Sequence, residues 1–247
     1  YGAIAPAAGQ YRRLSPFSAR MRETIGAIYE DLGRHARFAG LLFHDDAFLS
    51  DFEDANPEAL AAYRRAGLPG SIAAMRADGA AFARWTGLKT ETLVALTGEL
   101  AERTRRWCAP LRTARNLYAR PVLDPAAETW FAQSLPAFLA GYDRTAIMAM
   151  PYMEEAADAE AFLRALYARV AATPGALERT VFEVQAADWR TQPARPVPAR
   201  RLRAQLRLLQ RLGAHHMGWY PDDFIAGRPE AEVVQDAISA RSFPFRR

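Results

Sequence analysis

The sequence predicts an α/β fold in which strands and helices alternate, as either a doubly wound sheet or a (β/α) barrel. Five apolar runs that read as strands are separated by amphipathic stretches, the pattern of parallel βαβ crossovers. The run AIMAM at 146–150 is apolar throughout, as expected of a parallel strand buried on both faces. Neither G-x-G-x-x-G nor G-x-x-x-x-G-K-[ST] follows any of these strands, which counts against a nucleotide-binding sheet.

The first half of the chain supplies two of these strands, which we expect at 38–43 and 116–122. Ser15-Pro16 predicts an N-cap followed by proline at the first helical position, and Asn56-Pro57 predicts a second helix start. The apolar face of the first helix holds Met21, Ile25, Ile28, Tyr29 and Leu32, and that of the long helix before the second strand holds Leu93, Leu96, Leu100 and Trp107.

The second half supplies three further strands, which we expect at 145–150, 180–185 and 214–220. Asp124-Pro125 predicts a helix start, Gly213 predicts a helix end, and a short final helix is expected near 230–239. The intervening helices carry the apolar sets Trp130, Phe131, Leu135 and Phe138; Phe162, Leu166 and Val170; and Leu202, Leu206 and Leu209.

Composition narrows the class of protein. Half of the 247 residues are hydrophobic, enough for one sizeable core. The single cysteine, Cys108, excludes an internal disulfide. The formal net charge of +4 comes from arginines spread over helix faces, which favours solvated surfaces over nucleic-acid binding. No apolar run approaches the ~20 residues of a membrane helix. The chain opens on YGAIAPAAGQ with no visible signal peptide, so we expect upstream segments to have been removed.

Polar and aromatic side chains recur where the predicted strands end. In a barrel the C-terminal strand ends converge on one face, which holds the active site. For the barrel alternative, the sequence therefore predicts an acidic, aromatic cleft. The side chains expected around it are His44, Asp45, Asp46 and Asp51 after the first strand, Arg120 and Asp124 after the second, Tyr152, Glu154 and Glu155 after the third, Glu183, Gln185, Asp188 and Trp189 in and after the fourth, and Trp219, Tyr220, Asp222 and Asp223 at the fifth.

The carboxylates each have a structural alternative. Asp45 and Asp46 are neighbours, so at most one faces the cleft squarely, and both could instead form a turn or helix cap. Glu183 lies in an apolar strand, where an unpaired carboxylate is costly; its alternative is a salt bridge to an arginine. Glu154 could simply begin a helix, where carboxylates suit the dipole.

The aromatic residues are candidates for sugar-stacking surfaces. Trp189 lies beside Asp188, and Trp219 and Tyr220 lie beside Asp222. Their alternative is a place in the hydrophobic core.

A metal centre is the rival interpretation of the same acidic residues. His44 with Asp46 has a ligand-like spacing, and His215-His216 adds two imidazoles. The chain has only four histidines and lacks H-E-x-x-H and C-x-x-C, so no metal and no other cofactor is predicted. Two carboxylates across an aromatic cleft instead suit glycosidic bond hydrolysis.

Five blocks of sequence resemble the C-terminal half of the bacterial poly-β-1,6-N-acetyl-D-glucosamine N-deacetylases of the PgaB type. The blocks occur in family order between about Leu14 and Phe224. They read LLFHDDAFLSDFEDA, NLYARPVL, AETWFAQSLPAFLAGYDRTAIMAMPYME, TVFEVQAADW and GWYPDDF.

The resemblance implies a periplasmic, two-domain protein of biofilm exopolysaccharide, associated with the outer membrane through upstream sequence. Its second domain is a (β/α) barrel that binds the partly deacetylated polymer and, in some members, cleaves it. We expect residues 1–247 to be the C-terminal part of that barrel, with the first barrel strands and the deacetylase domain absent, because five strands are readable where a barrel needs about eight.

The resemblance orders the candidate residues. Counting back from GWYPDDF as the last strand places LLFHDD on strand four and TVFEVQ on strand seven, which are common catalytic positions in barrel glycosidases. Asp46 is the candidate general acid, with Asp45 as its alternative, and Glu183 or Glu154 is the second carboxylate. Burial after an apolar strand and like charge from Asp45 are expected to raise the pKa of Asp46. The candidate substrate-binding residues are His44, Asp51, Tyr152, Asp188, Trp189, Trp219, Tyr220 and Asp222.

Two functions fit this pattern. The first is an endo-acting glycoside hydrolase on partially deacetylated poly-β-1,6-N-acetylglucosamine, whose free amines suit acidic groups. The second is a module that holds the deacetylated polymer for export without cleaving it. The resemblance adds the exopolysaccharide export machinery as a partner.

Overall fold

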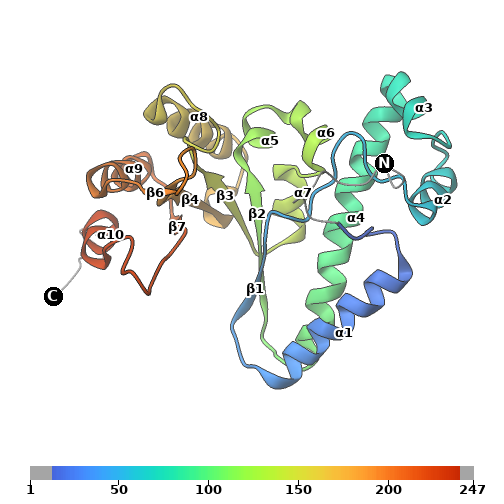
Figure 1. Ribbon diagram of the computed structural model, residues 1–247, viewed down its shortest axis with the longest axis horizontal. Helices are drawn as coiled ribbons and strands as arrows, with labels where there is room; N and C mark the ends of the chain where they lie inside the picture. The colour runs from blue at the N-terminus through green and yellow to red at the C-terminus, as the bar shows by residue number, and fades with distance from the viewer. Residues whose placement is uncertain (1–12, 240–247) are drawn as a thin grey trace. The chain divides into compact units, whose positions relative to one another are not determined.

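The computed structural model describes residues 13–239, and the chain divides into two compact units (Figure 1). Within the described residues, the first unit comprises 13–115 and 125–143, and the second comprises 116–124 and 144–239. Strand β2 runs from the first unit into the second.

The first unit contains a parallel pair of strands and several helices. Strand β1 pairs with the first half of β2 in the register Gly40↔Arg112 to Phe43↔Arg115. Its elements are α1 (Ala19–His35), β1 (Gly40–Phe43), α2 (Pro57–Arg65), α3 (Ile72–Ala77), α4 (Gly79–Arg105), β2 (Arg112–Tyr118), η1 (Pro125–Ala127), α6 (Glu128–Phe131) and α7 (Leu135–Gly141).

The second unit contains three parallel strands in the order β3-β4-β7 and a short antiparallel hairpin of β5 and β6. Glu183 of β4 is opposite Met148 of β3 and Gly218 of β7. Its elements are α5 (Ala119–Leu123), β3 (Arg144–Ala149), α8 (Ala159–Ala171), η2 (Leu177–Arg179), β4 (Thr180–Gln185), β5 (Ala187–Asp188), β6 (Arg195–Pro196), α9 (Ala199–Leu212), β7 (His216–Tyr220) and α10 (Ala231–Ile238).

The predicted alternation of strands and helices is confirmed, and the second strand was misplaced. Strand β4 has the predicted bounds, and β1, β3 and β7 differ from theirs by one or two residues. The predicted strand at 116–122 overlaps β2 only as far as Tyr118, because residues 119–123 form α5. Pro121 explains the change: proline has no N–H for a sheet ladder but is tolerated in the first turn of a helix.

Helix α1 packs differently from its predicted apolar face. Ile28 and Leu32 are exposed, Ile28 by 59%, whereas Gly26 and Gly33 are buried. A Cβ at Gly33 would lie 2.8 Å from the carbonyl oxygen of Thr104, so the glycine lets α1 approach α4 closely (Figure 1). The N-cap is Ser18, three residues after the predicted one.

The helix predicted after Asp124 is broken into three short pieces. Helix α6 ends at Phe131 and is followed by the C-cap Ala132, which has a left-handed φ of 50°. Ser134 then caps a new helix, α7, with its hydroxyl accepting from the N–H of Ala137. Trp130 is exposed as a result, and Trp107, predicted on the face of the preceding helix, lies beyond the end of α4 and is also exposed.

The other helix boundaries follow the predicted signals. Asn56 caps α2 with Pro57 in its first turn, and Gly213 ends α9 with a left-handed φ of 106°. None of the helices between residues 13 and 239 has the length and apolar character needed to span a bilayer.

Candidate active site

The turn after β1 brings His44, Asp45 and Asp46 together. The imidazole Nδ1 of His44 lies 2.7 Å from Oδ1 of Asp45 and 3.5 Å from Oδ2 of Asp46. Asp45 is only 7% exposed, whereas the side chain of Asp46 is 77% exposed. The two carboxylates therefore differ strongly in solvation, as expected of neighbouring residues that point different ways.

The prediction that Asp46 is buried, made from the apolar run before it, is wrong. Strand β1 is itself largely accessible, with Leu42 55% exposed and only Phe43 buried. The Asp46 carboxylate is therefore in contact with solvent.

Arg115 stabilises this turn through a hydrogen bond and was not predicted from the sequence. It lies on β2, fully buried, opposite Phe43 in the strand register. Its Nη2 donates to the carbonyl of Ala47 at 2.5 Å, and Gln133 Nε2 donates to the carbonyl of Asp45 at 3.4 Å. Burial lowers the pKa of the Arg115 guanidinium, and the nearby Asp45 charge opposes that shift. An arginine inside an apolar strand was the available signal, but the predicted strand began one residue too late.

Asp51 lies in the next part of the same loop, where its charge is compensated. Its carboxylate and backbone carbonyl both accept from Arg76. Lys89 donates from α4 to the carbonyl of Ser50 at 2.6 Å. Glu53 pairs with Arg13 at 2.7 Å. The loop thus holds a network of ion pairs, and binding of substrate by Asp51 stays a prediction.

In the second unit, Glu183 projects from β4 and is half-buried. Its Oε2 accepts from the Nδ2 of Asn116 at 3.0 Å. Asn116 is buried on β2 and belongs to the same unit. The amide donor thereby fixes the orientation of this carboxylate.

Glu154 is a carboxyl with a raised pKa. It lies in the turn after β3, where burial raises its pKa and the backbone and charge of Arg120 partly oppose the rise. The alternative that Glu154 begins a helix is wrong, because α8 begins at Ala159 and is capped by Asp158. A carboxyl group with a raised pKa keeps its proton to higher pH, which suits proton donation.

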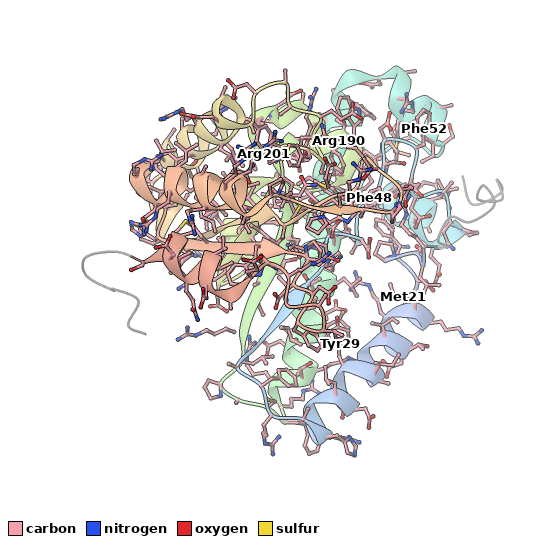
Figure 2. All side chains as sticks on the ribbon, turned by 60° about the vertical axis from the view of Figure 1, so that its left-hand side comes forward. Met21, Tyr29, Phe48, Phe52, Arg190 and Arg201 are labelled. Carbon is pink, nitrogen blue, oxygen red and sulfur yellow. The ribbon has the colours of Figure 1, made fainter. Side chains whose placement is uncertain are left out.

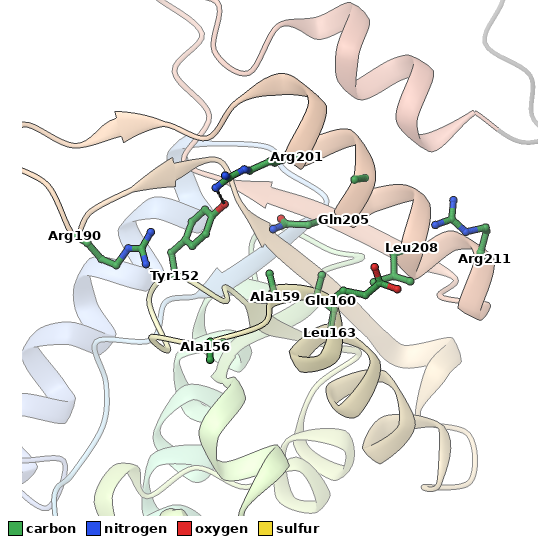
Figure 3. Close-up of a pocket in the computed structure, with 12 residues that line it drawn as sticks. Tyr152, Ala156, Ala159, Glu160, Leu163, Arg190, Arg201, Gln205, Leu208 and Arg211 are labelled. Carbon is green, nitrogen blue, oxygen red and sulfur yellow. Dashed lines mark hydrogen bonds between the residues drawn. The ribbon is translucent and has the colours of Figure 1, made fainter.

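Tyr152 is fixed in the same turn by both backbone and side-chain contacts. Gln185 Oε1 accepts from the N–H groups of Tyr152 and Met153, each at 3.1 Å. Arg201, which is labelled with Arg190 in Figure 2, donates to the Tyr152 hydroxyl at 3.0 Å. The guanidinium of Arg190 lies 4.5 Å from the centre of the Tyr152 ring (Figure 3). Tyr152 is buried, so little of its ring is available for stacking on a sugar.

The remaining aromatic candidates are accessible. None of Trp189, Trp219 and Tyr220 is buried, so their alternative place in the core is wrong. The rings of Trp189 and Tyr220 are 6.0 Å apart at 38°. Trp219 donates from Nε1 to Asp222 at 3.2 Å. Such rings with polar edges suit contact with a sugar.

Asp188 is paired with Arg190 by two hydrogen bonds, at 2.9 and 2.7 Å. The hydrogen bond from Arg190 holds the pKa of this carboxyl below its usual range. Asp188 therefore already has a cationic partner, and a substrate that bound to this carboxylate would share it with Arg190.

The structure thus forms two groups of candidates, one in each unit. His44, Asp45 and Asp46 meet in the first, and the carboxyl ends of β3, β4 and β7 carry the second. The approach of Asp46 to Glu183 stays a prediction.

One donor set could hold a cation. His44, Asp45 and Asp46 place one imidazole and two carboxylate ligand atoms within 4.8 Å of one another. His215 and His216 lie in the other unit, with ring centres 6.5 Å apart, and His216 Nε2 contacts the carbonyl of Glu178.

Comparison with known proteins adds the family context. The profile of GHL13, described as hypothetical glycosyl hydrolase family 13, matches residues 2–220. Proteins described as poly-β-1,6-N-acetyl-D-glucosamine N-deacetylase, from Escherichia coli strain K12 and strain O157:H7, are each 41% identical over 239 residues. That match covers 95% of this chain, which spans 36% of their length.

A solved structure shares the fold. The PgaB (BpsB) glycoside hydrolase domain from Bordetella bronchiseptica is 47% identical, with a TM-score of 0.89 over 96% of this chain and 68% of that one. The parallel strands and helices described here are therefore those of a (β/α) TIM-like barrel glycoside hydrolase domain, as predicted.

Proposed function

Because the chain belongs to hypothetical glycosyl hydrolase family 13, we propose that it hydrolyses the glycosidic bonds of partially deacetylated poly-β-1,6-N-acetyl-D-glucosamine. The relatives from Escherichia coli are named for this polymer, and the similar Bordetella bronchiseptica domain is described as a glycoside hydrolase. The polymer substrate and the endo-acting mode of cleavage are both parts of this proposal.

The contrast between the candidate carboxyl groups is the observation that carries this proposal. Glycoside hydrolysis needs one protonated and one ionised carboxyl group in different environments. Burial raises the pKa of Glu154, Asn116 donates to Glu183, and Asp46 is solvated beside His44.

These environments revise the expected roles. The sequence suggested Asp46 as the general acid. We propose Glu154 for this role instead, because its environment suits proton donation. Asp46, Asp45 and Glu183 are then the candidates for the ionised group. His44 would orient the Asp45 and Asp46 carboxylates through its short contacts to both.

Incubation of the purified chain with partly deacetylated polymer, followed by mass spectrometry of the products, tests the proposal. Shorter oligomers from the wild type, and their loss in Glu154→Gln and Asp46→Asn variants, would support it. A polymer that stays intact over a range of pH and acetylation would overturn it. If that intact polymer is still bound, the chain is the non-catalytic binding module instead.

We also propose a periplasmic location and a functional link to the exopolysaccharide export machinery. Both rest on the similarity to the polymer-named relatives. Localisation of a tagged full-length protein by cell fractionation would test the first.

A further inference from the structure

A pocket of about 460 Å³ lies between helices α8 and α9 in the second unit (Figure 3). Its volume falls in the range of small-molecule sites. Small side chains leave this space open, because Ala159 on α8 and Ala204 on α9 both line it. Leu163 and Leu208 contribute larger apolar surfaces from the same two helices. The pocket therefore has room for a small molecule with an apolar part.

Positive charge dominates the lining of this pocket. Its charged residues are Glu160, Arg190, Arg201 and Arg211. Two of them have partners of opposite charge outside the pocket, since Arg190 pairs with Asp188 and Glu160 pairs with Arg164, each at 2.7 Å. Within residues 13–239, Arg201 and Arg211 form no ion pair. The uncompensated charge of the lining is thus positive, which favours an anion over a cation.

Arg201 is the arginine that is already held in position. One of its guanidinium nitrogens donates to the Tyr152 hydroxyl at 3.0 Å, and the backbone N–H of Tyr152 donates to Gln185. A guanidinium has further N–H groups to offer. Arg201 is exposed and lines the pocket, so a ligand can reach those groups. A side chain that is fixed in advance loses little conformational freedom on binding.

The spacing along α9 defines the size of ligand that fits. Arg211 follows Arg201 by ten residues, a distance of ~15 Å along the helix axis, and Figure 3 shows the two arginines apart. A small anion therefore contacts one of them and not both. Leu208 follows Arg201 by only seven residues, ~10 Å along the same axis, with Ala204 between them. A short aliphatic chain that starts at Arg201 would run along Ala204 towards Leu208.

We propose that this pocket binds a small carboxylate with a short aliphatic chain. The carboxylate oxygens would accept two N–H groups of Arg201, because the planar guanidinium matches a carboxylate in charge and shape. The chain would pack against Ala204, Leu163 and Leu208. This ligand differs in class from the polymer of the proposed function, whose free amines are cationic and unsuited to a place beside Arg201.

The direct test is titration of the isotope-labelled full chain with hexanoate, hexylamine and acetate at neutral pH, followed by NMR. Hexanoate and hexylamine have chains of equal length and opposite charge, whereas acetate keeps the carboxylate and lacks the chain. We expect hexanoate to shift the side-chain N–H resonance of Arg201 and the methyl resonance of Ala204. It should bind about tenfold more tightly than either of the other probes.

Two of the possible outcomes would overturn the proposal. Hexylamine binding as tightly as hexanoate would show that the arginines do not select the ligand. Acetate binding as tightly as hexanoate would show a charged surface without an apolar site.

Two variants and one control locate the binding. Arg201→Met removes the charge, and Ala204→Leu fills the pocket from an exposed helical position. Each should weaken hexanoate binding about tenfold. Arg200→Met removes a neighbouring exposed arginine of α9 that does not line the pocket, and should have no effect. Equal losses in Arg200→Met and Arg201→Met, or unchanged binding in a folded Ala204→Leu variant, would refute the site.

The outcome is separable from that of the proposed function. Cleavage of the polymer by a wild type that does not respond to hexanoate would refute only the carboxylate site. Binding of hexanoate in this pocket of a chain that cleaves nothing would refute only the hydrolase proposal.

Discussion

At the scale of single residues, the candidate carboxyl groups are distinguished by solvation more than by sequence position. Leu41, Leu42 and Phe43 suggested a buried setting for Asp46, yet the carboxylate lies in a solvated turn. Residue type and order could not reveal this, because exposure of a strand end depends on what packs against it. Glu154 gained its raised pKa from a turn whose conformation the sequence did not predict.

The first prediction concerns the pH dependence at Glu154. If Glu154 donates a proton, cleavage is lost as the pH rises through its folded-state pKa. The charge of Arg120 holds that pKa down against burial, so Arg120→Met should raise it and move the alkaline limb of the pH–rate profile upward. Glu154→Gln should lower the rate by roughly 10²–10⁴-fold.

Arg200→Met is the matched control, because Arg200 is an exposed arginine on α9. Its pH–rate profile should follow that of the wild type. An alkaline limb that is unmoved in Arg120→Met would remove Glu154 from the role of acid.

The second prediction concerns the accessible aromatic rings. Trp189→Ala and Trp219→Ala should each weaken oligosaccharide binding by about 1 kcal/mol, about fivefold, through lost ring contact. Neither ring is buried, so the melting temperature should change little. Calorimetric titration with partly deacetylated oligomers measures the first effect. A collapse in thermal stability with both changes would make the rings structural instead.

At the scale of elements, periodic patterns and caps were predicted better than close approaches. The caps at Asn56 and Gly213 are local signals, readable from a few residues. The packing of α1 was misjudged because its contact with α4 depends on Gly26 and Gly33, residues that apolar periodicity ignores. The break between α6 and α7 depends on a left-handed alanine, Ala132, that no composition rule would select.

The third prediction tests the α1–α4 contact. Gly33→Ala should destabilise the fold by about 1–3 kcal/mol, since its Cβ would meet the Thr104 backbone at 2.8 Å. Gly98→Ala is the control on α4, where a Cβ would have nothing within 4 Å. That change should stabilise by about 0.5–1 kcal/mol because alanine is the better helix former. Urea unfolding measures both, and equal effects would contradict the close packing.

The fourth prediction concerns Lys89, the only lysine of the chain. Burial lowers its pKa to about 7, although the charges of Asp51 and Glu53 partly oppose the shift. Below pH 7 both the folded and unfolded states hold the proton, and the cost of the buried charge is fully present. Between about pH 7 and 10.5 the unfolded state binds more protons. The free energy of unfolding should therefore rise with pH, by up to about 1.4 kcal/mol per unit.

Comparison with Lys89→Met isolates this contribution. The variant lacks the titrating group, so its free energy of unfolding should vary less between pH 7 and 9. It also loses the hydrogen bond to the Ser50 carbonyl. That loss changes the free energy of unfolding at every pH and leaves its dependence on pH unchanged. Parallel pH profiles for the two proteins, measured by urea unfolding, would contradict the lowered pKa.

At the scale of the whole molecule, the class of fold was predictable and the arrangement of the site was not. Alternating strands and helices sufficed for the α/β class, because parallel crossovers leave a periodic trace along the chain. The choice of a barrel over a doubly wound sheet came from the family resemblance. The candidate carboxylates fall in separate compact units, with Asp46 in the first and Glu183 in the second. A distance between such groups arises from long-range packing, for which a single sequence carries no local signal.

The last prediction concerns how the whole chain would select the proposed polymer. The formal net charge is +4, so long-range attraction would not explain the proposed binding of a cationic polymer. Selection must come from carboxylates close to the amines, such as Asp46, over less than the ~10 Å screening length at 0.1 M salt. We therefore expect partly deacetylated oligomers to bind more tightly than fully acetylated ones, and added salt to narrow that difference. Asp46→Asn should narrow it too, while Asp31→Asn, on exposed α1, should not. Equal calorimetric affinities for the two oligomers in the wild type would show that the carboxylates do not select the amine.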